Sequence, residues 1–438
     1  MAHGGGIYTT QNKVLTGVYF KITSTPKTVT NLGERGIVAL PIALNWGEQG
    51  KVFTVTAEDF QNKSLNILGY QYDAPELMPF REIFKNAVKA LVYNLASGGT
   101  AASNDYATAK YAGALGNSMQ VIVQKNVDDS NLFDVTLVRI DMGNRELYTQ
   151  TVASAAELTD NDFVTWKKDA TLVVTAGTPL AGGEDGTVDT AAYQTALNKF
   201  EAYNFNSLAG APNDARDTAK TLNDLFTAYT KRHREQSPSL FQSVIASDTA
   251  KPDHEGVVVL PTKQANALYW VAGALAGAKG NTSCTNQTYD GEQTIDVDYT
   301  QTELELFIKS GVFVFHNVEG EARVLKDINS FVTYTDTKGK DYSKNQVIRG
   351  LDTHCLAITR KHNDKYVGKI QSDVGGRNSL WADIVDIARE QEAERTLENY
   401  DSSKLIVSEG NDKVSNVVDE ELDFVCAMEK LYVNITLK

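Results

Sequence analysis

This sequence lacks the features that mark membrane, disulfide-bonded and metal-binding proteins. It has only three cysteines, Cys284, Cys355 and Cys426, which are widely scattered and form neither a CxxC pair nor a Cys/His cluster. Such usage predicts free thiols in a reducing cytoplasm. The nearest approach to a bilayer-spanning run is residues 271–278, which is far short of the ~18 apolar residues that a span requires.

Positive charge is also scarce, because the formal net charge at pH 7 is −14. Binding to nucleic acid or to an anionic membrane requires a basic surface. The first six residues, Met-Ala-His-Gly-Gly-Gly, lack the basic and apolar regions of a signal peptide. We therefore expect synthesis in the cytoplasm, no nucleic-acid partner and no insertion into a membrane.

Catalytic motifs are missing as well. No Gly-x-Ser-x-Gly elbow, Walker loop, Gly-x-Gly-x-x-Gly turn or His-Glu-x-x-His helix occurs. Ser283 and Cys284 lie in a polar loop without a base placed by any motif, and residues 184–186 are too short for a calcium loop. The later histidines show no metal-ligand spacing; they are His233, His254, His316, His354 and His362. The sequence thus predicts a protein that is not an enzyme and has no cofactor or metal.

The apolar periodicity predicts a multidomain α/β protein with extended strand arms at both ends. Residues 1–28 are expected to form an N-terminal arm. Residues 29–96 and 187–335 should form an α/β core domain, in which helices cover a buried sheet. Residues 97–186 read as a β-rich inserted domain, and residues 336–438 as a C-terminal α+β domain that ends in a strand arm.

Individual elements follow from the same patterns. Residues 42–77 carry little usable periodicity. The expected helices are 79–95, 193–200, 218–231, 265–278 and one that starts near Ser379. The expected strands are 36–41, 119–127, 132–140, 170–176, 241–246, 256–260, 303–308, 312–315, 323–327 and 414–418.

Both chain ends alternate in the manner of a half-buried strand. The residues on one side of these strands are Val14, Thr16, Val18, Phe20 and Ile22 near the start, and Leu431, Val433, Ile435 and Leu437 at the end. An unpaired strand offers N–H and C=O groups to another chain. Two interpretations remain open at this point: the termini pair within their own subunit, or identical subunits exchange strands.

One segment reverses the acidic balance of the chain. Residues 338–369 carry eight lysines and arginines against three aspartates, a net charge of +5 (8 − 3). This run is either a solvated loop face or a docking patch for an acidic partner. The patch candidates are Lys338, Lys340, Lys344, Arg360, Lys361, Lys365 and Lys369. Arg349, which stands beside Ile348, is a candidate for a structural role instead.

Several segments resemble contractile tail sheath proteins of phages. Residues 8–19, 34–41 and the triplet Asn45-Trp46-Gly47 resemble the family's N-terminal region. Residues 110–117 resemble a sheath signature in which a Tyr-Pro-Gly turn precedes a Gly-Asn pair, with Ala112 in the place of the proline. Residues 272–277, followed by Ser283 and Thr285, resemble the family's small-residue helix and loop.

The resemblance implies a structural subunit of a phage tail or contractile injection system. Hexameric rings would stack as a helical polymer around an inner tail tube, joined by the terminal arms, and contraction would drive the tube through a target envelope without nucleotide hydrolysis. Baseplate and terminator or collar proteins would be further partners. The basic patch would then face an acidic tube surface. The short length and the arm sequence resemble the branch found in phage-like particles and R-type bacteriocins of Gram-positive bacteria, such as diffocins.

Two other functions remain as alternatives. The first is a non-contractile self-assembling shell or tube protein, and the second is an α/β hydrolase with a β-sandwich insert. For a sheath subunit, we expect synthesis in the bacterial cytoplasm and release as part of a phage tail or bacteriocin particle.

Overall fold

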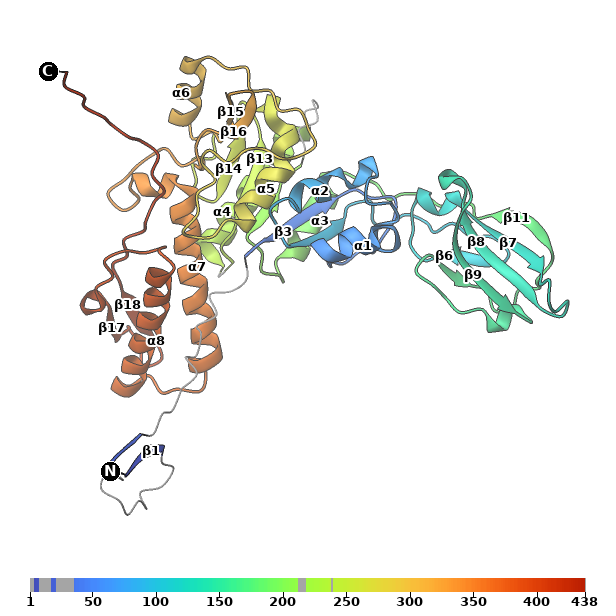
Figure 1. Cartoon of the computed structure of the whole chain (residues 1–438), viewed down its shortest axis with the longest axis horizontal. Coiled ribbons are helices and arrows are strands. Elements are labelled where there is room, and N and C mark those ends of the chain that lie inside the picture. Colours follow the sequence, from blue (N-terminus) through green and yellow to red (C-terminus); the bar gives the residue numbers. More distant parts are fainter. Residues whose placement is uncertain (1–3, 8–16, 21–34, 212–217, 238, 438) are drawn as a thin grey trace.

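The computed structural model of the chain describes residues 4–7, 17–20, 35–211, 218–237 and 239–437, the first two of these as backbone alone. Figure 1 shows an elongated molecule in which an α/β core lies between a β-sandwich at one end and a helical C-terminal unit at the other. This is the mixed α/β, multidomain fold that the sequence predicts.

The core is built on a six-stranded sheet. In sheet order its strands are β14 (Val257–Leu260), β13 (Gln242–Ala246), β12 (Ser207–Ala209), β3 (Ile37–Ile42), β5 (Lys89–Asn94) and β4 (Phe53–Thr56). All neighbours are parallel except β4, which runs antiparallel to β5. The strands are short runs of mainly apolar, β-branched residues, and both faces of a mostly parallel sheet are buried. Helices must therefore cover both sides.

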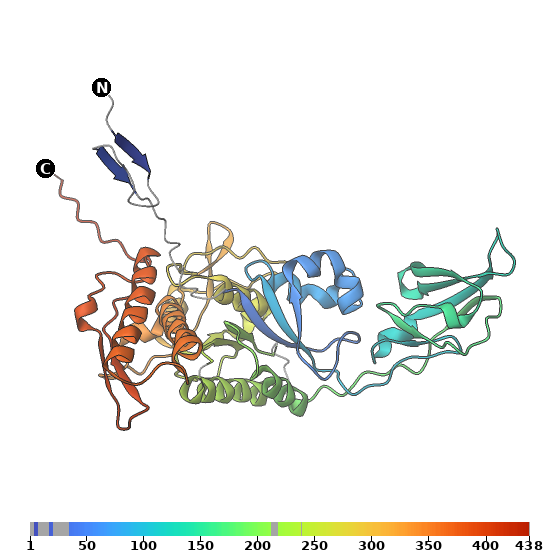
Figure 2. The same cartoon turned by 90° about the horizontal axis from the view of Figure 1, so that it is seen from below.

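Two helical layers provide this cover (Figure 2). One layer contains α1 (Ala57–Leu68), η1 (Pro75–Leu77), α2 (Met78–Ile83), η5 (Thr262–Ala267) and α5 (Leu268–Gly277), and the other contains α3 (Thr190–Phe200) and α4 (Thr218–Gln236). Alternate residues of β3 separate accordingly, because Val38 and Leu40 face the α5 layer whereas Ala39 faces the α3–α4 layer.

The β-sandwich interrupts the core between β5 and α3. One sheet has the order β11 (Thr175–Pro179), β7 (Met119–Lys125), β8 (Phe133–Arg139) and β9 (Arg145–Val152), and the other pairs β10 (Val164–Trp166) with β6 (Ala107–Ala109). All pairs are antiparallel. The sandwich encloses its own apolar cluster, separate from the two clusters of the core sheet.

The C-terminal unit packs helices against a hairpin. Its elements are α7 (Asn345–Lys361), the π-helical turn η7 (His362–Tyr366), α8 (Val374–Ala393), β17 (Ile406–Glu409) and β18 (Asn416–Asp419). At the edge of the core lie α6 (Gln301–Lys309) and the hairpin of β15 (Phe315–Val318) and β16 (Glu321–Val324). The short 3-10 turns are η2 (Ala114–Ser118), η3 (Ile140–Met142), η4 (Ala155–Glu157), η6 (Lys340–Ser343) and η8 (Ser402–Lys404).

The predicted helix 79–95 is wrong beyond its first turn. Helix α2 ends at Ile83, and residues 89–94 form β5 in the middle of the sheet. Leu91, Val92 and Leu95 satisfy both a helical stripe and a buried strand, because a strand buried on both faces has no alternation of its own. Residues 89–94 form a strand because they pair with β3 on one side and β4 on the other.

The predicted strand 303–308 is also wrong, since these residues belong to α6. Thr300 and Glu303 form a capping box, which fixes a helix start that the Glu-Leu-Glu-Leu alternation hides. The expected elements do not include helices α1 and α7 or strands β4, β6, β9, β10, β12 and β17. The third sandwich strand lies at 175–179 rather than 170–176, and β15 and β16 are similarly displaced from 312–315 and 323–327.

Candidate functional site

Among the residues that the structure describes, the C-terminal arm beyond Glu429 has no partner. In the described part of the arm, residues 430–437 form no strand and project away from the folded units (Figure 1). The four side chains predicted to face inward are exposed instead: Leu431 by 79%, Val433 by 64%, Ile435 by 81% and Leu437 by 92%. A segment with the pattern of a half-buried strand thus stands in solvent with its backbone edges open.

The arm is anchored just before it becomes free. Phe424 pairs with Leu397 and packs against Gly350 of α7, where a Cβ would lie 2.8 Å from the Phe424 ring. The Ala427 N–H donates to Gln346 Oε1 at 3.0 Å, and Glu429 lies 3.5 Å from the Lys326 ammonium. The last fixed residue is therefore Glu429.

The N-terminal arm is described only in part. Val18 and Phe20 belong to β2 (Gly17–Phe20), which pairs in parallel with β1 (Gly4–Ile7). Val14, Thr16 and Ile22 lie outside the described residues. Within the described residues, neither arm pairs with the other.

The basic run does not form one patch. Lys338, Lys340 and Lys344 precede α7, whereas the other four candidates lie at or beyond its end. A helix of 17 residues separates the two groups by about 25 Å, at about 1.5 Å per residue. The distal group is Arg360, Lys361, Lys365 and Lys369.

Much of this charge is neutralised within the subunit. Ion pairs join Lys338 to Glu255 at 3.1 Å, Lys344 to Asp341 at 2.8 Å and Lys365 to Asp383 at 2.7 Å. The Lys369 ammonium donates to the carbonyl of Asp364 at 2.6 Å. In the part of the chain that the structure describes, no carboxylate partner is found for Lys340 or Lys361. Arg349 is fully buried against Asp327 at 2.7 Å, as its apolar neighbourhood suggests.

A buried ionic junction joins the core to the C-terminal unit. The Arg234 guanidinium of α4 donates to both oxygens of Asp352 on α7, at 2.8 and 2.7 Å. Beside it, Glu255 accepts from Lys338. The loops that carry Glu255 and Lys338 are also tied together, because the Val332 and Thr333 N–H groups donate to the side-chain Oδ1 of Asp253 at 2.8 and 3.0 Å. The orientation of the C-terminal unit thus depends on fixed polar contacts.

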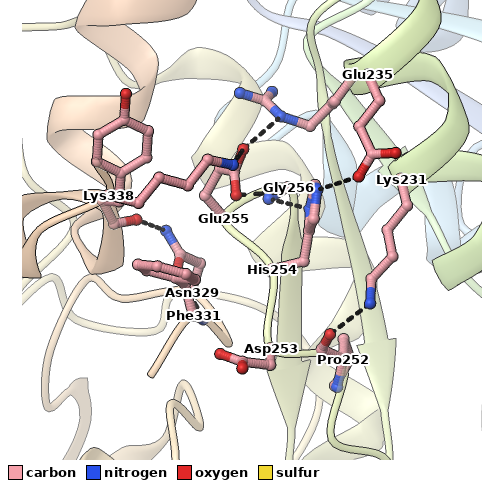
Figure 3. Close-up of polar contacts among 12 residues, drawn as sticks. Lys231, Glu235, Pro252, Asp253, His254, Glu255, Gly256, Asn329, Phe331 and Lys338 are labelled. Carbon is pink, nitrogen blue, oxygen red and sulfur yellow. Dashed lines mark hydrogen bonds and ion pairs between the residues drawn. The ribbon is translucent and has the colours of Figure 1, made fainter. Parts of the chain in front are cut away.

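His254 occupies the centre of this junction (Figure 3). Its Nδ1 accepts from the Gly256 N–H at 3.0 Å, and its Nε2 lies 3.8 Å from Glu255 and 4.0 Å from Glu235. Burial lowers the pKa of His254, and the charges of Arg234 and Lys338 add to this effect while Glu255 opposes it. Burial alone would raise the pKa of Glu255, but His254, backbone N–H groups and the two cations together hold it below its ordinary value.

Sequence reasoning missed this junction. Arg234 and Asp352 are 118 residues apart, so no local motif links them. Ser283 and Cys284, the nucleophile candidates in the sequence, have structural surroundings. Cys284 is buried, which raises its pKa to about 12, and Ser283 donates to the Thr285 hydroxyl.

Across the described residues, no group of three or more His, Cys, Asp or Glu side chains could hold a metal ion. In the same part of the chain, no helix has the length and apolarity to cross a bilayer.

Four family models match consecutive parts of the chain. They are described as tail sheath protein Gp18 domain III N-terminal region (residues 35–95), phage tail sheath protein beta-sandwich domain (97–185), phage tail sheath protein central domain (186–330) and phage tail sheath C-terminal domain (337–438). Two proteins of Bacillus subtilis are similar over nearly the full length. The phage-like element PBSX protein XkdK is 31% identical over 98% of this chain and 99% of its own, and the uncharacterized protein YqbK is 30% identical over 99% and 100%.

Solved structures give the same result. A sheath tail protein from Desulfitobacterium hafniense is 33% identical, with a TM-score of 0.78 over 95% of this chain and 99% of the other. One from Listeria innocua is 28% identical, with a TM-score of 0.77 over 92% and 94%. The anti-feeding prophage helical sheath in its contracted state shares the fold, with a TM-score of 0.54 at 10% identity over 97% and 99% of the two chains.

Proposed function

Because this chain belongs to the phage tail sheath protein family, we propose that it polymerises as stacked hexameric rings around an inner tail tube and contracts to drive that tube through a target envelope. The exposed C-terminal arm is the observation that carries this proposal. A strand-forming segment that is anchored at Glu429 and open beyond it is suited to complete a sheet in another copy of the chain. The alternating residues near the N-terminus would do the same from the other end.

We propose the following division of labour among the domains. Residues 1–28 and the C-terminal strand are linking arms, residues 29–96 and 187–335 are the core, and residues 336–438 line the lumen. The inserted residues 97–186 would form the outer surface of the polymer. Their attachment at one end of an elongated molecule supports this arrangement (Figure 1).

We propose that the tube contact uses the basic residues that remain available. A sheath must hold its tube and later release it, so many weak contacts suit this role better than one apolar interface. Exposed ion pairs contribute about 0.2–1 kcal/mol each and are screened over about 8–10 Å at physiological salt. Lys340 and Lys361 are the main candidates among the seven, since several others are already paired.

The particle to which this sheath belongs is proposed from resemblance. Full-length similarity to a protein of a phage-like element supports a phage tail or an R-type bacteriocin of the diffocin kind. Baseplate and terminator or collar proteins would cap the sheath at its two ends, and no nucleic acid or membrane contact is needed. Assembly in the bacterial cytoplasm and release with the particle follow from the same role.

Electron microscopy of the expressed full chain tests the function. Hollow striated cylinders are expected for a sheath. Smooth shells or tubes would instead favour a non-contractile assembly protein, and dispersed particles at high protein concentration would contradict self-assembly.

A further inference from the structure

A tryptophan of the core is buried inside the sandwich. Trp46 lies in the loop that follows β3, and its side chain is fully buried in the sandwich's apolar cluster. Its ring meets Tyr111 edge-on at 5.3 Å between centroids and lies 6.5 Å from Phe163. Trp46 thus belongs to the core by sequence but packs inside the sandwich, whereas Trp270 packs within the core itself.

The core holds this loop in place with a buried amide. Asn94, at the end of β5, accepts from the Leu44 and Ala96 N–H groups at 3.1 and 3.0 Å. Its Nδ2 donates to the Leu44 and Trp46 carbonyls at 2.9 and 3.2 Å. Since every polar atom of this side chain is used and the residue is inaccessible, the position of Trp46 is fixed from the sheet.

Two glycines permit the close approach. Gly113 has a φ of +136°, and a Cβ there would lie 2.1 Å from the Asn45 carbonyl oxygen. A Cβ on Gly69 would lie 2.6 Å from the Trp46 ring. Only glycine fits at such contacts. Gly113 of the 110–117 signature and the 45–47 triplet therefore form one structural unit.

The two linkers to the sandwich are tied to each other at the same place. Asn117 donates to the Gly183 carbonyl and accepts from the Gly183 N–H, both at 2.8 Å. Thr100 and Glu184 exchange backbone hydrogen bonds at 2.9 and 3.1 Å. From the end of β8, the buried Arg139 donates to the Gly69 carbonyl at 2.9 Å.

We infer that the 45–47 triplet and the 110–117 signature form a clasp that makes the sandwich and the core a single rigid body. A hinge at this neck would have to move Trp46 out of the sandwich, and it would leave Arg139 without the Gly69 carbonyl and Gln49 without the Ala112 carbonyl. The value of such rigidity rests on the proposed sheath role, in which the outer domain must follow the core as the subunit rotates. The clasp itself is a property of the single chain.

Hydrogen–deuterium exchange of the full chain at low concentration tests the clasp. In the native protein, the amides of Thr100, Gly113, Gly183 and Glu184 should exchange as slowly as those of the β7–β8 hairpin. Trp46→Ala should speed exchange at the neck by roughly tenfold or more, with the hairpin unchanged, because opening becomes local.

Trp166→Ala is the matched control, since Trp166 lies in the same apolar cluster but belongs to the sandwich itself. It should speed exchange throughout the sandwich, hairpin included. If Trp46→Ala does not fold, Gln49→Ala removes the bond that the Gln49 amide of the core loop donates to the Ala112 carbonyl at 2.9 Å, and it should open the neck alone. Fast exchange at the neck of the native protein, or a Trp46→Ala pattern equal to that of Trp166→Ala, would overturn the inference. Both results are independent of whether the chain forms sheaths.

Discussion

At the scale of single residues, the ion pair between Arg234 and Asp352 is the sharpest test of the junction. Both side chains are almost inaccessible, at 5% and 6% exposure. Asp352→Asn would remove the bidentate charge partner of the buried guanidinium and leave it Glu255, 4.0 Å from its Nε. Loss of one member of a buried pair costs about 3–5 kcal/mol. We expect that loss in the free energy of unfolding measured with denaturant.

Asp224→Asn is the control for this measurement. The Lys220–Asp224 pair has similar geometry, at 2.8 Å, but its side chains are 78% and 63% exposed. Its removal should cost less than about 1 kcal/mol. Equal effects from the two variants would show that the junction is not a buried ion pair in solution.

His254 should make stability depend on pH. Its pKa is lowered in the folded protein, so the unfolded chain binds the proton more readily. The free energy of unfolding should therefore be highest above the unfolded pKa of about 6.5, and should fall as the pH drops through that value until the folded group also titrates.

His254→Gln should remove this component, because glutamine does not titrate. The fold should be kept, since the glutamine oxygen can still accept from the Gly256 N–H. The native protein should lose stability relative to the variant between about pH 7 and pH 5.5. Substituting the exposed His362 in the same way is the control. A constant difference between native protein and His254→Gln across this range would contradict the assignment.

At the scale of elements, we expect removal of the C-terminal arm to leave the fold undisturbed. Deleting residues 431–438 leaves the anchor at Phe424 and Glu429 intact, so we expect a folded, soluble monomer or ring that cannot form long polymers. The missing strand would span roughly 23 Å. Its ladder bonds contribute about 0.5–1.5 kcal/mol each, and its four aliphatic side chains up to about 1.5–3 kcal/mol each.

Electron microscopy and sedimentation check this outcome. Serine at Leu431, Val433, Ile435 and Leu437 should act like the deletion, whereas serine at Tyr432, Asn434 and Thr436 should leave polymers intact. Long sheaths from the truncated chain would rule out strand exchange through this arm.

The C-terminal end of α7 offers a test of the tube contact. Lys361→Glu reverses a charge without an intramolecular carboxylate partner among the described residues, so the fold should be unaffected. Assembly on the tube should weaken, or contraction should occur early. Lys365→Glu would also break the intramolecular ion pair with Asp383, so its effect on the tube contact is harder to separate from an effect on the fold.

The salt dependence provides the check on this variant. An electrostatic defect should grow at low salt, where exposed charges are least screened. Extended particles of Lys361→Glu and of the double variant with Lys365→Glu that are normal at both low and high salt would exclude this surface.

At the scale of the whole molecule, the sandwich is an insertion whose ends meet. The Gly186 N–H donates to the Ala96 carbonyl at 3.0 Å, so Ser97 can be joined to Gly186 across a short gap. Deleting the intervening residues together with Trp46→Ser should give a folded core that still assembles. The second change matters because deletion alone would expose Trp46.

Circular dichroism and microscopy distinguish the outcomes. The same deletion with Trp46 retained should be less soluble but folded. Loss of folding in both variants would show that the core depends on the sandwich for more than the burial of Trp46.

The sequence by itself determined the class of the fold, the family and most of the regular elements with a clear period. Residues 119–125 and 133–139 alternate cleanly because one face of an antiparallel strand is buried. The small-residue helix α5 and the long helices α4 and α8 were equally readable. The absence of catalytic motifs and the alternation at the C-terminus are likewise local facts, which need no knowledge of what lies nearby.

Only the tertiary structure decided what depends on distant partners. β5 was mistaken for a helix because a doubly buried strand has no period, and only its neighbours β3 and β4 identify it. The basic run reads as one patch in sequence, yet α7 divides it and Glu255, more than 80 residues away, neutralises Lys338. Arg234 with Asp352, and Trp46 with the sandwich, are brought together by the fold alone, because contact energy depends on distance in space and not along the chain.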